Sequence, residues 1–574
     1  MNNLLALTWR LLKGGGRRGL LGSSLTVAAV AVSTALLLFA VAINFAFAGR
    51  AERGAWRNPE QATEVPAAAA RAIEATRAEF TGDRMITTVH VAVLSPGVRP
   101  PAGITRLPSP GEVVMSPGLA ELTAADPSFG RRFPQKRTGT IGDEALVHPG
   151  ELVAVVGHAP GDDIMTAKWK GDYRLGVSAR RIAGFTGHPS SDAEAYRALA
   201  AVASVLMVVP LLVFGGAAAR LTVARRDRRL ASLRLVGATP GQVVAMTVAE
   251  AIITAFAGAM LGLLLYTVAI PPLTQVRISG GAWFASDIWP GALPIGAVLL
   301  AVPLLVGLSA VVGLRRVVVS PLGVARRETP PAMRFLRVIA LLACLAAVPA
   351  FGAGVSVTFV VVVLSLAFLA VNLVGPWVVG MIGRVTARTA KRPARLLAGR
   401  RLVDDPRSAW RTVSGVALTG FVAGFIGLLT PSTSLAIEND PMTAWLLQDI
   451  RTGTTIVLVV SFLVAIVSAG ITAASSVLDR RQTYALLRLA GTDLEVLDKA
   501  RRLETLIPLT VMGGGSIVTG MFCAAPFASL GMSATGVVTL LVCAALGFAG
   551  VIAAGALSRP LLRSVTTDPA PRPD

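Results

Sequence analysis

The sequence predicts an all-α polytopic membrane protein with one small α+β domain outside the membrane. Of its 574 residues, 53% are hydrophobic and only 15% are charged, whereas soluble domains carry about 25% charged residues. Apolar runs long enough to cross a bilayer, which takes about 20 residues, recur along most of the chain. A single long polar region, residues 49–195, separates the first of these runs from the others. We therefore expect most of the chain to lie in lipid.

The formal net charge of +21 is concentrated in short loops between the apolar runs. The positive-inside rule places such loops in the cytoplasm, so this charge indicates membrane topology rather than nucleic-acid binding. Cys344, Cys523 and Cys543 lie inside apolar runs without the spacing of a metal or redox site, and we interpret them as small hydrophobic residues. The four histidines fall in the polar region, and their spacing predicts no metal site.

The first apolar run, residues 20–48, follows a basic N-terminus and is predicted to be an uncleaved span. Residues 46–48 resemble a signal-peptidase site, but the run exceeds the apolar core of a signal peptide, which measures about 7–15 residues. Ten spans in a four, two, four arrangement place both termini and every basic-rich short loop on the cytoplasmic side. The predicted spans are residues 20–48, 196–223, 243–270, 291–314, 335–353, 356–382, 412–430, 454–477, 503–530 and 533–557.

The polar region has nearly balanced acidic and basic residues, in contrast to the basic loops, and this favours an extracytoplasmic location. It is about 145 residues long, a normal domain size. Its pattern predicts a helix over residues 67–80 and strands over 85–93 and 152–157. The outer loop of the last four spans, residues 431–449, is short by comparison. Residues 384–411 are expected to form the most basic cytoplasmic loop.

A basic amphipathic segment, residues 225–237, links the second and third predicted spans. Leu230, Leu233 and Gly237 fall at helical spacing on one face, and arginines cluster near the start. Gly237 is expected to end this helix, because glycine readily adopts the left-handed conformation found at helix ends. Residues 239–242, with the sequence Thr-Pro-Gly-Gln, then predict a new helix that opens with a capping box.

The same segment occurs a second time at residues 479–491. Aligned without gaps, Leu487 and Arg488 lie over Leu233 and Arg234, and Gly491 lies over Gly237. Residues 492–495 repeat the capping-box pattern, and the two glutamates that follow also align. Several matches in register, in the same hydropathy context, predict an internal duplication.

Ionisable residues are rare inside the predicted spans, which disfavours a proton- or ion-coupled transporter. Glu250 and Glu504 lie near the cytoplasmic ends of their spans. We expect each to form a structural ion pair with a nearby arginine, Arg501 or Arg502 in the case of Glu504, rather than to relay protons. Asn44 and Asn372 are expected to form hydrogen bonds between helices.

No catalytic or nucleotide-binding motif appears in the sequence. Residues 14–19 contain glycines but lack the lysine and hydroxyl of a phosphate-binding loop. Neither a zincin motif nor a nucleophile elbow is present. We therefore expect no catalytic residue, cofactor or metal ion in this chain, so any nucleotide must be bound by a partner.

The pattern Arg-Arg-x-x-x-Leu-x-Leu-Val-Gly-Ala-Thr-Pro-x-Gln at residues 228–242, followed by Arg-Arg-x-x-x-Ser-Pro at 315–321, resembles the FtsX/MacB-type permeases of ABC transporters. The resemblance is weaker at residues 479–510, where Thr-Asp-Leu replaces Ala-Thr-Pro. It implies a duplicated permease domain whose two amphipathic segments are coupling helices that contact a separate ATPase. The docking residues that it implies are Arg226, Arg229, Leu230, Leu233, Arg234, Gly237, Arg480, Arg481, Tyr484, Leu487, Arg488 and Gly491.

The resemblance also implies that ATP binding and transport are carried out by separate subunits. Two copies of a cytoplasmic ATP-binding subunit would hold ATP and Mg²⁺, and the permease, in a bacterial plasma membrane, would export or extract an amphipathic substrate such as an antimicrobial peptide, a lipid or a lipoprotein. The alternative is a non-transporting FtsX-like regulator, in which residues 49–195 bind and activate an extracytoplasmic cell-wall hydrolase. The sequence is predicted to divide into five units. Residues 1–48 contain the first span, residues 49–195 form the outer domain, and residues 196–327 contain the rest of the first repeat. Residues 328–411 contain the central spans, and residues 412–574 contain the second repeat.

Overall fold

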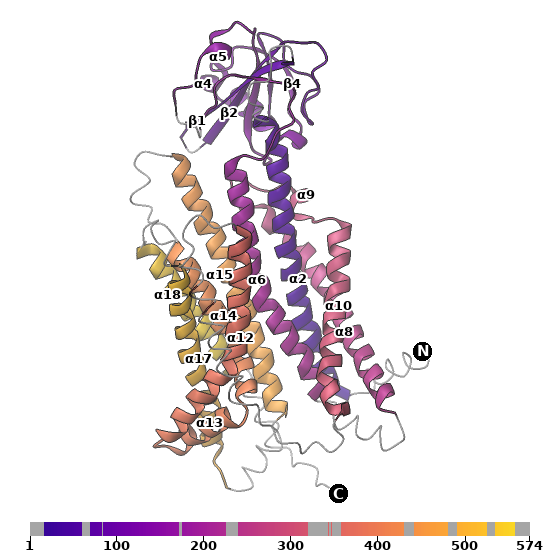
Figure 1. Cartoon of the computed structure of the whole chain (residues 1–574), viewed down its shortest axis with the longest axis vertical. Helices are drawn as coiled ribbons and strands as arrows, with labels where there is room; N and C mark the ends of the chain where they lie inside the picture. Colours follow the sequence, from indigo (N-terminus) through magenta and orange to yellow (C-terminus); the bar gives the residue numbers. More distant parts are fainter. Residues whose placement is uncertain are drawn as a thin grey trace.

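A computed structural model shows a bundle of long helices with a small β-rich domain at one end (Figure 1). The structure describes residues 16–59, 69–82, 84–171, 175–224, 239–319, 343, 346, 357–429, 441–479, 491–524 and 534–556. The predicted span at residues 335–353 therefore lies almost entirely outside the described residues. The chain is a multi-pass membrane protein, and seven described helices are long and apolar enough to cross a bilayer. The full count of ten spans stays a prediction.

The first group of helices contains α2 (Gly16–Gly54), α6 (Ser191–Ala224), α8 (Pro240–Thr274) and α10 (Ala292–Val319). These helices cover the first four predicted spans. α2 packs closely on α8 because two glycines of α8 lie against it. A Cβ at Gly258 would lie 2.7 Å from the Val30 Cβ, and one at Gly262 would lie 2.5 Å from the Ala31 carbonyl oxygen. Small residues of this kind allow membrane helices to approach each other closely.

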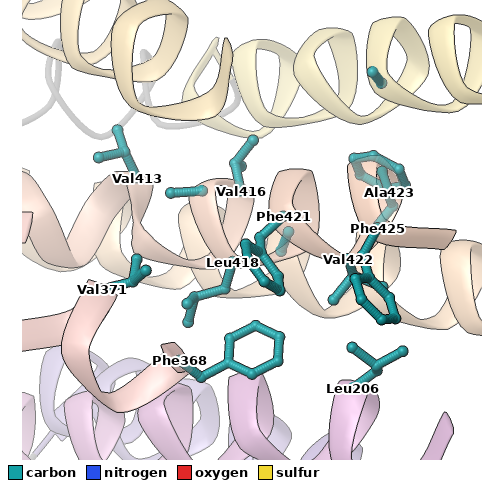
Figure 2. Packing of buried hydrophobic residues seen from close by; sticks show 14 of the residues in the cluster. Leu206, Phe368, Val371, Val413, Val416, Leu418, Phe421, Val422, Ala423 and Phe425 are labelled. Atoms are coloured by element: carbon teal, nitrogen blue, oxygen red, sulfur yellow. The ribbon is translucent and has the colours of Figure 1, made fainter. Parts of the chain in front are cut away.

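The second group contains α12 (Val357–Arg388), α14 (Pro406–Leu429), α15 (Pro441–Asp479), α17 (Leu494–Ala524) and α18 (Ala534–Ala556). α14 is its centre, since 83% of the apolar window in α14 is buried inside the protein. Phe421 of α14 packs edge-on against Phe368 of α12, with ring centroids 5.1 Å apart (Figure 2). Leu206 of α6 belongs to the same cluster, so this core joins the two groups of helices.

Large apolar side chains on the outer helices face outward at helical spacing. On α8, Phe256, Met260 and Leu264 are about half exposed, and Leu300, Leu304 and Leu308 form a similar row on α10. A soluble protein of this size would not leave such continuous apolar faces uncovered. These faces are therefore the surfaces that contact lipid.

Several predicted boundaries were wrong at the ends of spans. α15 begins at Pro441 rather than near residue 454, so much of the predicted outer loop is helical. The predicted basic loop at 384–411 contains a separate helix, α13 (Pro393–Asp404), whose Ala398 and Leu402 are buried. Ala398 and Leu402 are four residues apart, on the face that meets α12, where a Cβ at Gly383 would lie 2.7 Å from the Leu402 Cβ. The high arginine content of this segment hid that apolar stripe.

The β-rich domain is built on one mixed six-stranded sheet, with strand order β4-β3-β5-β2-β1-β6. The predicted strands at 85–93 and 152–157 are confirmed, and the α+β class of the domain is confirmed with them. Short helices α3 (Pro117–Ala125), α4 (Pro127–Gly130) and α5 (Asp163–Thr166) complete it. The strands are β1 (Ala72–Thr81), β2 (Arg84–Val93), β3 (Glu112–Met115), β4 (Lys136–Thr140), β5 (Leu152–Gly157) and β6 (Arg180–Ile182).

The predicted helix at residues 67–80 was wrong, because residues 72–80 of this segment belong to strand β1. β1 pairs antiparallel with β2 at ten positions, from Ala72 opposite Val93 to Thr81 opposite Arg84. Gly82 follows with φ +64°, a conformation that suits a tight hairpin turn. The alanine-rich composition favours a helix locally, but pairing with β2 and burial of Ala72 and Ala75 outweigh that preference.

Glu74 of β1 is a buried carboxylate in this sheet, with 1% of its surface exposed. One carboxylate oxygen accepts a hydrogen bond from the Thr76 hydroxyl at 3.2 Å, while the other has no hydrogen-bond partner among the described residues. Burial raises the pKa of Glu74 to about 7, although the positive charge of Arg180 acts in the opposite direction. The folded domain therefore prefers this side chain protonated.

We expect Glu74→Gln to make the outer domain less sensitive to pH. The unfolded chain ionises Glu74 near the ordinary pKa of 4.5, whereas the folded chain does so near 7, so stability falls as pH rises through this window. The loss is on the order of 3 kcal/mol. Thermal unfolding of the domain in the purified chain should show that the stability of Glu74→Gln rises relative to that of the natural protein between pH 5 and pH 8. A difference between the two proteins that stays constant over this range would contradict the assignment.

Candidate functional site

Most of the docking residues implied by the resemblance lie outside the described residues. These are Arg226, Arg229, Leu230, Leu233, Arg234, Gly237, Arg480, Arg481, Tyr484, Leu487 and Arg488, and their docking roles stay predictions. Gly491 is described and has φ +86°, the left-handed conformation expected of a glycine that ends a helix. The structure does, however, show how both segments connect to the spans that follow them.

The predicted capping box at the start of α8 is confirmed. The Thr239 hydroxyl accepts a hydrogen bond from the Gln242 backbone N–H at 3.3 Å, and the Gln242 side-chain oxygen accepts one from the Thr239 N–H at 3.1 Å. Pro240 occupies the first turn, where its missing N–H costs nothing. Such caps contribute about 1 kcal/mol to a helix start, so α8 begins at a defined residue directly after the first segment.

The second segment is followed by a helix start that differs by one residue from the prediction. α17 begins at Leu494, and the Asp493 carbonyl accepts a hydrogen bond from the Leu497 N–H at 3.2 Å. Asp493 rather than Thr492 therefore directly precedes the helix. Glu495 forms an ion pair with Lys499 at 2.6 Å, one turn further along α17.

The predicted structural ion pair of Glu504 is confirmed, and the arginine seen beside it is Arg401. Glu504 lies 3.5 Å from Arg401 of α13, whereas Arg501 and Arg502 contact Asp498 at 3.3 Å and 2.8 Å. The ion pair therefore joins the central linker to the second repeat, a contact between segments that are distant in sequence. For Glu250, the expected arginine pairing stays a prediction.

The opposite ends of the spans meet the outer domain around one loop, residues 275–284, which we call the junction loop. Arg50 of α2 is buried beside it and donates hydrogen bonds to the Ile278 carbonyl at 2.6 Å, the Gly281 carbonyl at 3.4 Å and the Ala282 carbonyl. The guanidinium also lies 3.4 Å from the ring centroid of Trp283. One side chain thus contacts three backbone carbonyls of the loop, two of which also pair across the bridge between Ile278 and Gly281.

Asp449 of α15 holds the same loop from the second repeat. Its carboxylate accepts hydrogen bonds from the Ser279 backbone N–H at 2.7 Å and from the Tyr196 hydroxyl at 2.6 Å. Ser279 has φ +55°, an uncommon conformation for a residue with a side chain. Asp449 therefore connects α15 of the second repeat to α6 and to the junction loop of the first.

The outer domain is attached to the junction by two arginines, Arg53 at the end of α2 and Arg57 in the short helix that follows. Arg57 of the short 3-10 helix η1 (Ala55–Arg57) forms two hydrogen bonds with Glu151, at 2.5 Å and 3.0 Å. Burial raises the pKa of Glu151, but the charge and hydrogen bonds of Arg57 outweigh burial and hold it below its usual value. Arg53 bridges Asp287 at 2.7 Å and the Leu146 carbonyl at 2.8 Å.

The junction loop also touches the outer domain directly. A Cβ at Gly281 would lie 2.1 Å from the His148 Nδ1, so only glycine fits beneath this ring. At the other end of the domain, Phe80 of β1 packs edge-on against Trp445 of α15, with centroids 5.2 Å apart. The outer domain is therefore seated on both groups of helices.

Sequence patterns did not reveal the junction. Arg50 and Asp449 are single charges near the ends of apolar runs, and charges in such places often only mark a membrane boundary. The predicted interhelical hydrogen bonds are confirmed. Asn44 donates to the Ser204 hydroxyl at 2.5 Å, and Trp410 donates to the Asn372 side-chain oxygen at 3.0 Å. No three metal-ligating side chains gather within the described part of the chain.

Residues 201–321 match the family model of the FtsX-like permease C-terminal domain. The matched region contains most of α6, the first amphipathic segment, α8, the junction loop and α10. The match is consistent with an FtsX/MacB-type permease, a membrane component rather than a catalytic enzyme. A comparison with curated proteins finds no match.

We expect Asp449→Ala to loosen the junction loop. Removing the carboxylate leaves the Ser279 N–H without its charged acceptor, and hydrogen bonds to charged groups contribute about 1.5–3 kcal/mol. Hydrogen exchange of the Ser279 amide in the purified chain should accelerate by roughly tenfold or more. Tyr196→Phe is the matched control, since it removes a partner of Asp449 but keeps the bond to Ser279. Equal exchange rates in the two variants would show that Asp449 does not hold the loop.

Proposed function

We propose that this chain is the membrane-spanning permease subunit of an ABC transporter and is driven by separate cytoplasmic ATP-binding subunits. The match to an FtsX-like permease domain supports a permease of the ABC type. The proposal places both termini in the cytoplasm of a bacterium and residues 49–195 outside its plasma membrane. ATP and Mg²⁺ would be bound by two copies of the partner subunit, one at each amphipathic segment.

The helices that adjoin the two segments in the sequence, α8 and α15, both reach the junction loop, and this observation carries the proposal. The first segment leads into α8, which runs without interruption from its capping box to Thr274, at the start of the junction loop. The second segment follows α15, whose N-terminal part carries Asp449, which binds Ser279 of the same loop. A displacement of either segment along its helix would therefore arrive at one place, directly beneath the outer domain.

Long helices suit this role because their backbone hydrogen bonds are internal and resist compression. The junction transmits the movement of these helices to the outer domain through Arg57, Arg53 and the Gly281–His148 contact. In the proposed cycle, ATP-driven closure of the partner subunits pushes both segments, and the outer domain changes its position over the bundle. This movement would export or extract an amphipathic substrate, such as an antimicrobial peptide, lipid or lipoprotein, or transmit force across the membrane.

The alternative function uses the same movement without transport. A non-transporting regulator would pass the motion of the outer domain to an extracytoplasmic cell-wall hydrolase bound to residues 49–195. The two functions differ in what the outer domain holds. Recovery of such a hydrolase with the intact chain, together with ATP-dependent activation of the hydrolase, would favour the regulator.

Leu233→Asp or Leu487→Asp is expected to abolish stimulation of the partner ATPase by the permease. A charge in an apolar docking contact typically costs 2 kcal/mol or more, so the stimulated rate should fall roughly tenfold or further. Leu94→Asp, on the exposed surface of the outer domain, is the matched control and should leave stimulation intact. Full stimulation in both segment variants would contradict the docking role.

The purified complex is expected to contain two ATP-binding subunits for each chain. One chain carries two amphipathic segments, and each would occupy one subunit of an ATPase dimer. Native mass measurement of the complex in detergent gives the ratio directly. One ATP-binding subunit per chain would exclude the arrangement in which a single chain serves a whole dimer.

A further inference from the structure

A cavity of about 630 Å³ lies where α2 enters the outer domain. Its wall combines the end of α2 and η1 with Arg71, the loop at residues 97–102, Glu144 and residues 183–187. Sites for small ligands usually measure about 300–1,000 Å³, so this cavity is large enough for one. None of the interactions that build the junction fills it.

The cavity wall carries charges of both signs that form no ion pair within the described part of the chain. Arg71 and Arg99 are exposed there, and neither forms an ion pair with any described residue. Glu52 and Glu144 are exposed in the same wall and are likewise without an ion pair among the described residues. The neighbouring Arg53, by contrast, is neutralised by Asp287 at 2.7 Å. Among the described residues, two cations and two anions of this wall therefore have no ion-pair partner.

The remaining wall is apolar and rigid. Trp56 and Phe185, which are largely buried in the domain core, line the cavity together with Pro100 and Pro101. An apolar wall with a few charged groups is the usual composition of a site that orients a ligand. A ligand that fits this wall carries one negative group, one positive group and an attached apolar part.

The position of the cavity along α2 indicates where such a ligand comes from. Glu52 and Arg53 belong to the candidate membrane span that reaches from Thr26 to Arg57. The cavity therefore opens at the end of the hydrocarbon layer, where the polar headgroups add about 10–15 Å to the bilayer thickness. Phospholipid headgroups are the charged groups that fill this layer.

We infer that this cavity binds the headgroup of a zwitterionic phospholipid. Arg71 and Arg99 receive the phosphate, because guanidinium groups match phosphate geometry and charge. Glu52 and Glu144 receive the amine, and the glycerol end lies against the apolar wall. A purely anionic headgroup would neutralise the arginines, but its negative charge would be repelled by the carboxylates of Glu52 and Glu144. Headgroup binding requires only the membrane placement of α2 and is independent of the ATP-driven cycle proposed above.

The test measures binding of dihexanoyl phosphatidylethanolamine to the purified full chain by calorimetry in detergent, without a partner ATPase. Because two charge-assisted contacts with the phosphate are lost, Arg71→Gln with Arg99→Gln should weaken binding by about tenfold. Arg84→Gln with Arg137→Gln is the matched control, because it removes the same charge from exposed positions outside the cavity. Equal binding by these two double variants would overturn the inference.

The role of the Glu52 and Glu144 carboxylates is tested by the preference of the chain for one phospholipid headgroup over another. The natural chain should prefer dihexanoyl phosphatidylethanolamine over dihexanoyl phosphatidylglycerol, and Glu52→Gln with Glu144→Gln should remove or reverse this preference. Binding of the two lipids with equal affinity by the natural chain would contradict the zwitterionic site. Tighter binding of free phosphoethanolamine or of a zwitterionic tripeptide than of the phospholipid would assign the cavity to a soluble ligand and overturn the lipid assignment.

Discussion

The hydrogen bonds that hold the junction loop are the constraint on which the rest of the structure depends. The loop turns back on itself through a bridge between Ile278 and Gly281. The Arg50 guanidinium binds the carbonyls of this turn, and the Asp449 carboxylate binds its Ser279 N–H. Both charged groups are taken largely out of water, which is tolerated only where each finds good partners. Since Arg50 and Asp449 come from different repeats, the loop fixes the two halves of the bundle against each other and beneath the outer domain.

Much of the membrane fold could be predicted because the length and hydropathy of an apolar run decide whether it spans a bilayer. The same signal fails at helix ends. α15 begins about three and a half turns, and α17 about two and a half turns, before the predicted start of its span, because polar residues remain helical where the helix leaves the membrane. α13 was missed since its arginines outweigh its apolar stripe, and β1 was missed because its pairing with β2 is a tertiary effect. Hydropathy reports the solvent around a residue, not the backbone conformation.

The candidate site divides in the same way into local and distant contacts. The Thr239 capping box was predictable because all its atoms come from four consecutive residues. The ion pair between Arg401 and Glu504 and the contacts of Arg50 and Asp449 join residues that lie far apart along the chain. In the sequence, a single charge at the end of an apolar run looks the same whether it lies at a membrane boundary or forms buried hydrogen bonds with a loop. Only the packing of the helices brings them to one loop.

The central claim is that movement of the cytoplasmic segments reaches the outer domain through this loop. Pulsed electron-spin distance measurement tests it most directly, with one label at Arg137 on the outer domain and one at Leu446 on α15, both exposed. With the partner ATPase bound, the account predicts that the distance distribution shifts between the nucleotide-free state and the state trapped with ATP. A distribution that is identical in both states, in a complex that hydrolyses ATP, would contradict it.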